Sequence, residues 1–177
     1  ILKKYKLKNV VLDPVMIAKS GTRLVNNNSI KYLKKLLLPL CNVVTPNIPE
    51  AEVLTGYSIS NKDHMIKAGK KIISMGAKNV LLKGAHLKNK MIFDILVSKK
   101  EIRIFPKRKI KTRHTHGTGC TLSSALATCL SQKKSIHKSC KISLHYVDQA
   151  ISTAPGYGKG FGPLNHLVSF NLKDTNA

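Results

Sequence analysis

The segment Cys41-Asn-Val-Val-Thr-Pro-Asn47 is a short apolar run that ends in polar residues around a proline. Two other segments follow the same plan, Lys8-Asn-Val-Val-Leu-Asp13-Pro14 and Lys78-Asn-Val-Leu-Leu-Lys83-Gly84. Short continuous runs of Val and Leu are typical of strands that are buried on both faces of a parallel sheet. We therefore predict three parallel strands, each followed by a turn.

Helical patterns separate these runs. One helix is predicted from Ser29 to Leu38, with Asn28 as its N-cap and Pro39 as its stop. A second is predicted from about Asn61 to Met75, with Gly76 as its C-cap. Strands that alternate with helices indicate an α/β fold with right-handed crossovers, in which helices flank a mainly parallel sheet on both faces.

The second half of the chain continues with elements of both kinds. Met91–Val97 and Ile102–Phe105 have the composition of strands, but the sequence leaves their direction open. A helix should follow Gly117-Thr-Gly-Cys120, and another long helix should end at Gly156. We find no repeat, linker or sign of a second domain, so residues 1–177 are expected to be one part of a single domain.

Length and composition exclude several classes of protein. The chain has 177 residues, of which 42% are hydrophobic, enough for a core in one domain. Disordered, collagenous and disulfide-stapled small proteins are therefore excluded. No apolar run approaches the roughly 20 residues that span a bilayer. Because the chain starts at Ile1 without Met and a strand follows almost at once, we expect it to be a fragment.

The charge is strongly positive, with 31 Lys and Arg against 8 Asp and Glu and a formal net charge of +23. Such an excess attracts phosphates and nucleic acid. Contacts to DNA, however, favour Arg, and nearly all the basic residues here are Lys spread along the chain. We favour dispersed, solvated lysines and expect no specific nucleic acid as a partner. A basic nucleic-acid-binding module stays as an alternative, which salt-dependent retention on DNA would support.

The four cysteines form no C-x-x-C pair and have no histidines at zinc-site spacing. This pattern indicates a reducing, cytoplasmic location. Cys41, Cys129 and Cys140 lie in apolar surroundings and are interpreted as small core residues. Cys120 lies in a different setting, described below.

Polar residues follow the predicted strands where they end. Asp13, Asn47 with Glu50, and Lys83 should meet at one edge, because the carboxyl ends of parallel strands lie together and ligands bind there. Asn47 and Glu50 could hold magnesium, and Lys83 could neutralise phosphate oxygens. Each also has a simpler interpretation, since Asp13 could start a turn and Glu50 could complement a helix N-terminus. We expect the Glu50 side chain on the rim of the site and not in the core.

The segment His114-Thr-His-Gly-Thr-Gly-Cys-Thr121 directly precedes an apolar-periodic helix. Backbone N–H groups at such a helix start can face an anion, and the same helix end stabilises a thiolate at Cys120. The simpler alternative is a tight turn that enters a helix. His114 and His116 are interpreted as loop residues and not as metal ligands. An anion site, a lysine and magnesium ligands together indicate a kinase.

Several motifs carry a family resemblance. They are Val11-Leu-Asp13-Pro-Val15-Met, Thr45-Pro-Asn47-x-Pro-Glu50, Leu82-Lys83-Gly84-x-His86, Thr115-His-Gly-Thr-Gly-Cys120 and Gly158-x-Gly160-x-Gly162-Pro. In this order they resemble the hydroxymethylpyrimidine/phosphomethylpyrimidine kinases of thiamine biosynthesis, in the ribokinase-like superfamily. The resemblance implies two ATP-dependent phosphorylations, first of the hydroxymethyl group and then of the monophosphate, and a homodimer in the complete enzyme.

The resemblance also implies roles for individual residues. Glu50 and Asn47 would organise Mg2+, while Lys83, Asp13, Thr115 and Asn47 would contact ATP or face its phosphates and metal. Gly117, Thr118, Gly119 and Cys120 would form the anion hole, and Val15 would line the pyrimidine pocket. Many ribokinase-like sugar kinases carry an Asp as general base where this chain has Cys120. Cys120 is therefore expected to be the base or proton shuttle and to contact the substrate.

One departure from the family concerns its N-terminal part. The family's glycine-rich Asp-x-Ser-Gly-Gly-Ala-Gly segment, which precedes most pyrimidine contacts and a lid, has no counterpart in residues 1–177. We therefore expect an N-terminally truncated version of the fold that retains the ATP and catalytic part. Pyridoxal kinase activity and an inactive remnant of a kinase stay as alternatives, because the missing part would discriminate between substrates.

Overall fold

The computed structural model describes residues 1–18, 21–85 and 91–168. The chain divides into two compact units, Ile1–Arg108 and Lys109–Ala177, which are described separately below. The sequence-based expectation of a single domain stays a prediction.

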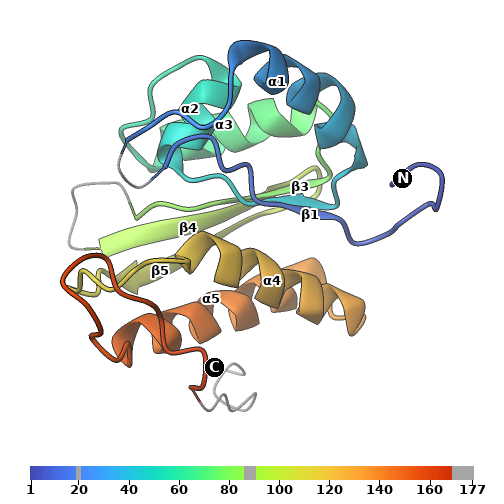
Figure 1. Ribbon diagram of the computed structural model, residues 1–177. Coiled ribbons are helices and arrows are strands. Elements are labelled where there is room, and N and C mark those ends of the chain that lie inside the picture. Colours follow the sequence, from blue (N-terminus) through green and yellow to red (C-terminus); the bar gives the residue numbers. More distant parts are fainter. Residues whose placement is uncertain (19–20, 86–90, 169–177) are drawn as a thin grey trace. The chain divides into compact units, whose positions relative to one another are not determined.

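The first unit contains a five-stranded sheet with the strand order β1-β2-β3-β4-β5 (Figure 1). Its strands are β1 (Val11–Leu12), β2 (Val43–Val44), β3 (Asn79–Leu82), β4 (Met91–Ser98) and β5 (Ile102–Arg108). Strands β1, β2 and β3 are mutually parallel, which confirms the prediction from the three apolar runs.

The predicted strands β4 and β5 are also confirmed, and their pairing is antiparallel. The turn between them is tight, because the Ser98 N–H donates to the Glu101 carbonyl at 2.9 Å. A parallel connection would need a crossover of about a dozen residues or more. The sheet is therefore mixed, where the sequence predicted a mainly parallel one.

Three helices of this unit lie on one face of the sheet in Figure 1: α1 (Asn27–Tyr32), α2 (Ile48–Thr55) and α3 (Lys62–Ser74). The apolar face of α3 supplies Met65, Ala68 and Ile72 to the core, where Val80 and Ile95 of the sheet also lie. Asn61 caps α3 through a bond from the His64 N–H, and Gly76 follows the helix at a φ of +112°. The predicted start of this helix is thus confirmed, but the predicted C-cap was one residue late, because Met75 is the C-cap and Gly76 is the residue after it.

The limits predicted for the first helix were wrong. Its N-cap is Asn26, whose side chain accepts the Ser29 N–H, and not Asn28. The chain then continues through a π-helical segment, Leu33–Leu37, into a 3-10 turn, Leu38–Leu40, that contains Pro39. Proline is tolerated in the first turn of a helix, where its missing N–H is not needed. Pro39 therefore lies inside a new turn and does not end the helical path.

The second unit is built on α4 (Thr118–Ser131) and α5 (Ile136–Ser152), which lie side by side in Figure 1. Leu122, Leu126 and Leu130 of α4 are buried, as are Leu144 and Val147 of α5. The predicted end of the second helix was late, because α5 ends at Ser152, before the left-handed turn at Gly156.

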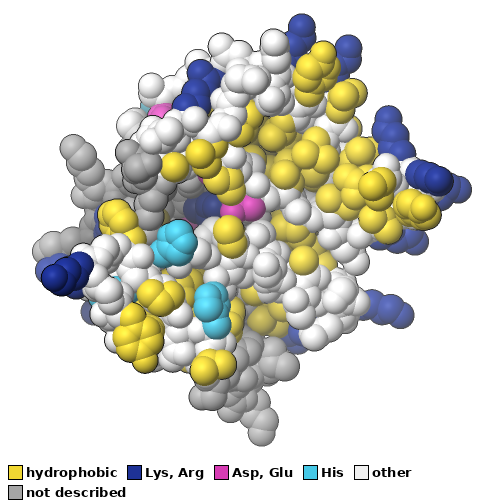
Figure 2. Space-filling view, in the orientation of Figure 1, with side chains coloured by type: hydrophobic (Ala, Val, Ile, Leu, Met, Phe, Trp, Pro, Cys, Tyr) yellow, Lys and Arg dark blue, Asp and Glu magenta, His cyan; other side chains and the backbone are white. Residues whose placement is uncertain are grey.

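Two properties of the whole sequence can be compared with the described residues. Within the described residues, no helix is long and apolar enough to span a membrane. On the face shown in Figure 2, their Lys and Arg side chains are scattered and do not gather in one stripe.

Candidate functional site

The first unit brings together the polar residues that follow β1, β2 and β3. The backbones of Asn47 and Lys83 form an isolated parallel bridge beyond the ends of β2 and β3. The Lys83 N–H donates to the Pro46 carbonyl at 2.9 Å. This register fixes the Lys83 backbone, and so the point from which its side chain extends, at the carboxyl end of the parallel strands.

Lys83 and Asp13 form an ion pair across this edge. The distance from Lys83 Nζ to Asp13 Oδ1 is 3.0 Å, and the two side chains are 14% and 12% exposed. The Thr45 hydroxyl donates to the same Asp13 oxygen at 3.1 Å. An ion pair that is mostly withdrawn from water is screened less than a surface pair. The pair therefore places a positive and a negative charge side by side at the carboxyl ends of the parallel strands.

Asn47 and Glu50 form a reciprocal cap at the start of α2. The Glu50 N–H donates to Asn47 Oδ1 at 2.9 Å, and the Asn47 N–H donates to Glu50 Oε2 at 2.8 Å. Glu50 is 3% exposed. Our expectation of a rim position for its side chain was therefore wrong, because the cap draws the carboxylate back toward the helix.

This burial affects the ionisation of Glu50. Desolvation raises the pKa of the Glu50 carboxyl above its usual value, while the hydrogen bond from the Asn47 backbone and the charge of Lys83 oppose the shift. A raised pKa means that the neutral acid is favoured relative to an exposed glutamate. A nearby divalent cation would reverse that preference, because it favours the anion.

In the second unit, α4 begins with an anion-binding geometry. Gly117 adopts a left-handed φ of +83°, and no side chain caps the helix. Thr121 is the first residue whose N–H bonds back into the turn, to the Gly117 carbonyl at 2.9 Å. The N–H groups of Thr118, Gly119 and Cys120 donate no hydrogen bond to any of the described residues. These three N–H donors lie at the N-terminus of α4, which is the positive end of the helix dipole.

Cys120 lies in the first turn of α4, and its thiol is exposed. The other three cysteines are buried, as the sequence predicted. Thr115, predicted to contact nucleotide, accepts the Thr118 hydroxyl on its carbonyl at 2.8 Å. Thr115 and Thr118 thus tighten the turn that leads into the helix.

The glycine-rich C-terminal stretch is fastened to this turn. The His116 N–H donates to the Gly162 carbonyl at 3.1 Å, and Arg113 donates to the carbonyls of Gly158 and Lys159. A side chain at Gly162 would collide with the His114 ring, 2.2 Å from its Nδ1. This stretch therefore holds the loop in place by backbone contacts that need glycine.

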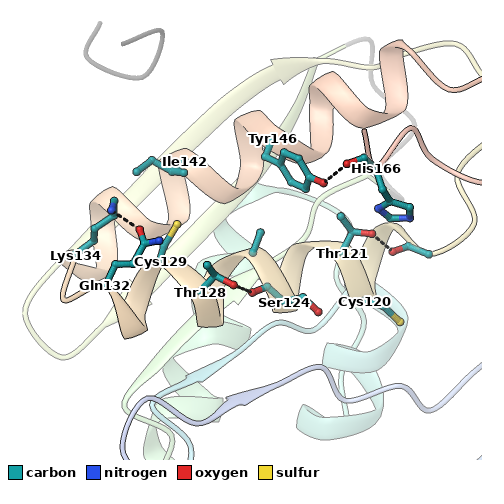
Figure 3. Close-up of a pocket in the computed structure, with 12 residues that line it drawn as sticks. Cys120, Thr121, Ser124, Thr128, Cys129, Gln132, Lys134, Ile142, Tyr146 and His166 are labelled. Atoms are coloured by element: carbon teal, nitrogen blue, oxygen red, sulfur yellow. Dashed lines mark hydrogen bonds between the residues drawn. The ribbon is translucent and has the colours of Figure 1, made fainter. Parts of the chain in front are cut away.

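A groove of about 730 Å3 extends along α4 from this turn. Figure 3 shows Cys120 at one end of the groove and Gln132 and Lys134 at the other, with Ile142 and Tyr146 of α5 along its side. The Tyr146 hydroxyl donates to the His166 carbonyl at 3.2 Å, which ties α5 to the segment after it. The exposed thiol thus borders an open hollow.

The sequence analysis missed two buried polar residues of the first unit. Thr45 is the first residue of the motif Thr45-Pro-Asn47, but no role was predicted for it. Asp94 interrupts the apolar strand β4, accepts the Gly84 N–H at 2.9 Å and pairs with Lys107 at 2.9 Å. An acidic residue inside an apolar run signals a specific buried partner, and that signal was available in the sequence.

Each unit, taken by itself, contains residues that suit a part of a magnesium nucleotide. In the part of the chain that the structure describes, no group of three or more His, Cys, Asp or Glu could hold a metal by itself. Mg2+ characteristically binds one or two carboxylates together with phosphate oxygens and water. Asp13 and Glu50, near the ammonium of Lys83, are such a donor set, and the free N–H groups of α4 suit phosphate oxygens.

The structure therefore sorts the predicted site residues into two groups. Asp13, Asn47, Glu50 and Lys83 meet in the first unit, and Thr115 and Gly117–Cys120 meet in the second. Val15, predicted to line a pyrimidine pocket, follows Asp13 and is 45% exposed.

Comparison with known proteins gives consistent matches. The sequence model of the phosphomethylpyrimidine kinase family matches residues 1–165. Hydroxymethylpyrimidine/phosphomethylpyrimidine kinase of Bacillus subtilis is 40% identical over 93% of this chain, which spans 61% of that protein. The chain thus spans about three fifths of this curated relative.

Solved structures give the same fold. The crystal structure of phosphomethylpyrimidine kinase from Clostridium difficile is 42% identical, with a TM-score of 0.73, over 85% of this chain and 60% of that one. An ADP complex of Bacillus subtilis pyridoxal kinase is 31% identical, with a TM-score of 0.84, over 93% of this chain and 61% of that one. The fold is thus the ribokinase-like α/β fold, and the chain belongs to the phosphomethylpyrimidine kinase family.

Proposed function

We propose that residues 1–177 are the nucleotide-binding and catalytic part of an ATP-dependent hydroxymethylpyrimidine/phosphomethylpyrimidine kinase. The observation that carries this proposal is the start of α4, where three N–H groups that have no acceptor among the described residues lie beside an exposed thiol. Phosphoryl transfer depends mainly on positioning and on stabilising charge at the transferring group. An uncapped helix start supplies the stabilising part.

The residues of the site have separate tasks in this mechanism. The α4 amides bind nonbridging phosphate oxygens, and Lys83 neutralises part of the phosphate charge. Magnesium, when bound, shields the phosphates, with Asp13 and Glu50 as the residues that would hold it and Asn47 supporting Glu50 through the cap. Acting as the thiolate, Cys120 takes the proton from the substrate hydroxyl as that oxygen forms its bond to the γ-phosphorus. The bond from the γ-phosphorus to the ADP oxygen breaks in the same step, and ADP leaves.

The substrate follows from the relatives. The Bacillus subtilis relative is named for phosphorylation of hydroxymethylpyrimidine and of its monophosphate, so we assign these two substrates to the complete enzyme. Pyridoxal is a second candidate, because the Bacillus subtilis pyridoxal kinase superposes with the higher TM-score of 0.84. The lower sequence identity of that kinase, 31% against 42% for the Clostridium enzyme, favours the pyrimidine.

A substrate competition tests this assignment. Residues 1–177, supplied with the N-terminal segment of the Bacillus subtilis relative, are incubated with Mg·ATP and equal amounts of hydroxymethylpyrimidine and pyridoxal. We expect the pyrimidine mono- and diphosphates to dominate the products measured by mass spectrometry. Dominant pyridoxal phosphate would instead assign the second candidate.

Two further properties belong to the same proposal. A cytoplasmic location is supported by the four free thiols, since disulfides are rare in reducing compartments. The homodimer implied by the family resemblance is proposed for the complete enzyme, and size-exclusion chromatography with light scattering would test it.

A further inference from the structure

Thr45 is a fully buried threonine directly beside the Asp13–Lys83 pair. It is 0% exposed, and its hydroxyl lies 3.1 Å from Asp13 Oδ1 and 3.5 Å from the Leu12 carbonyl. A hydroxyl has one hydrogen to donate. The shorter contact to a charged acceptor is the stronger one, so the hydrogen goes to Asp13.

Asp13 Oδ1 therefore receives two donors, Thr45 Oγ1 and Lys83 Nζ. The other carboxylate oxygen, Oδ2, receives no hydrogen bond from any residue within 1–18, 21–85 and 91–168. The Asp13 side chain is 12% exposed. Two donors on one oxygen restrict the orientation of the carboxylate and leave the second oxygen without a donor among the described residues.

We propose that Thr45 is a positioning residue that holds Asp13 in place for the magnesium nucleotide. This inference rests on the proposed function and adds a residue to it. When Lys83 turns from Asp13 toward a phosphate, Asp13 loses one of its two donors. The Thr45 bond remains, because the hydroxyl is buried, and it keeps Asp13 from following the lysine.

Three variants separate the hydroxyl from the volume of the side chain. Thr45→Val keeps the shape and loses the hydroxyl, and Thr45→Ser keeps the hydroxyl and loses a methyl group. Thr55→Val is the matched control, because the Thr55 hydroxyl donates to the Ala51 carbonyl inside α2, away from the ion pair. Should Thr45→Val fail to fold, Thr45→Ala compared with Thr45→Ser removes the hydroxyl at equal loss of the methyl group.

The readout is binding of Mn2+ and ADP to residues 1–177, followed by electron paramagnetic resonance of free Mn2+ and by calorimetry. The unfolding temperature of each variant is measured as well. Loss of a hydrogen bond to a charged group costs enough free energy to lower the binding affinity by roughly ten- to a hundredfold. We expect that loss in Thr45→Val, and affinities within about threefold of the parent in Thr45→Ser and Thr55→Val.

The outcomes are distinct. Parental Mn·ADP affinity in Thr45→Val overturns the positioning role and leaves the proposed function standing. Equal losses in Thr45→Val and Thr45→Ser, with equally lowered unfolding temperatures, show a packing role and also overturn it. Absence of Mn·ADP binding in the parent chain contradicts the proposed function itself, and the role of Thr45 with it.

Discussion

Glu50 illustrates how one residue serves the fold and the site together. Its carboxylate completes the cap of α2 and lies near Lys83 and Asp13, whose charges act on its ionisation in opposite directions. The pattern Asn-x-x-Glu in the sequence suggested both a helix cap and a metal ligand. The structure shows the cap, and the metal role stays a proposal that the nearness of the capped carboxylate to Lys83 and Asp13 supports.

The first prediction concerns Glu50→Gln and pH. Burial raises the pKa of Glu50 in the folded protein. The stability that this residue contributes is therefore fully present below its unfolded pKa of about 4.5 and is lost as the pH rises through the folded value. Glutamine does not titrate and still accepts the cap bond. Denaturant unfolding between about pH 4 and pH 8 should show the parent losing stability relative to Glu50→Gln.

In residues 1–177 supplied with the N-terminal segment of the Bacillus subtilis relative, the same variant should lower turnover far more than it changes stability at neutral pH. The reason is that the neutral amide lacks the charge for magnesium. Turnover unchanged at saturating Mg2+ would remove Glu50 from the mechanism. If the free energy of unfolding depended on pH in the same way in the parent and in Glu50→Gln, the raised pKa of Glu50 would be contradicted.

The second prediction concerns Cys120→Ser. The backbone N–H at this position is untouched, so affinity for ADP should stay unchanged. Loss of a general base lowers rates by about 10²–10⁴-fold, and we expect a decrease of that size in pyrimidine phosphorylation. Ser124→Ala, one turn further along α4, is the matched control and should keep the parental rate. Full activity in Cys120→Ser would limit Cys120 to a positioning role.

Among the elements, the end of β3 depends on one glycine. A Cβ at Gly84 would lie 2.0 Å from the Phe93 carbonyl oxygen, an atom of the neighbouring strand β4. The Gly84 N–H is also held by Asp94, whose other oxygen pairs with Lys107. The backbone that carries Lys83 is therefore fixed from the side of β4 as well as from β2.

The third prediction follows from this close approach. Gly84→Ala should lower the free energy of unfolding by about 1–3 kcal/mol, the usual range for overpacking, because a paired strand backbone cannot move aside. Gly160→Ala is the control, since nothing lies within 4 Å of a Cβ there. Denaturant titration measures both variants, and equal stability of the two would show that β3 and β4 separate easily.

Element by element, the sequence predicted those features that local residues determine. Asn61 caps the start of α3, and the prediction was right there, whereas the C-cap is Met75 and the predicted Gly76 follows it. At α1 three consecutive asparagines offered alternative caps, and the chain used Asn26 instead of Asn28. The antiparallel pairing of β4 depends on connection length and on long-range contacts, which periodicity does not contain.

On the scale of the whole molecule, the motifs identified the family, and the polar residues expected at the strand ends lie together in the first unit. Asp94 was recognisable in the sequence as an acid within an apolar run, but its partner and that of Thr45 could not be named in advance, because the fold brings these partners close. Thr45 meets Asp13 across two strands, and Asp94 meets Gly84 across another pair. Such contacts follow from register, and register was not determined by the sequence patterns.

The chain also spans only 61% of its Bacillus subtilis relative. The family resemblance implies a glycine-rich segment that precedes most pyrimidine contacts, and residues 1–177 contain no such motif. Positioning of reactants can account for roughly 7–11 kcal/mol of a barrier. We therefore expect residues 1–177 alone to bind nucleotide without phosphorylating pyrimidine at a significant rate.

Pyrimidine-dependent ATP consumption tests this account most directly. It is measured for residues 1–177 alone and after addition of the N-terminal segment of the Bacillus subtilis relative as a separate chain. The account predicts negligible turnover alone and clear turnover with the segment, abolished when hydroxymethylpyrimidine is omitted. Robust turnover by residues 1–177 alone would contradict it, because the substrate contacts would then lie within this chain.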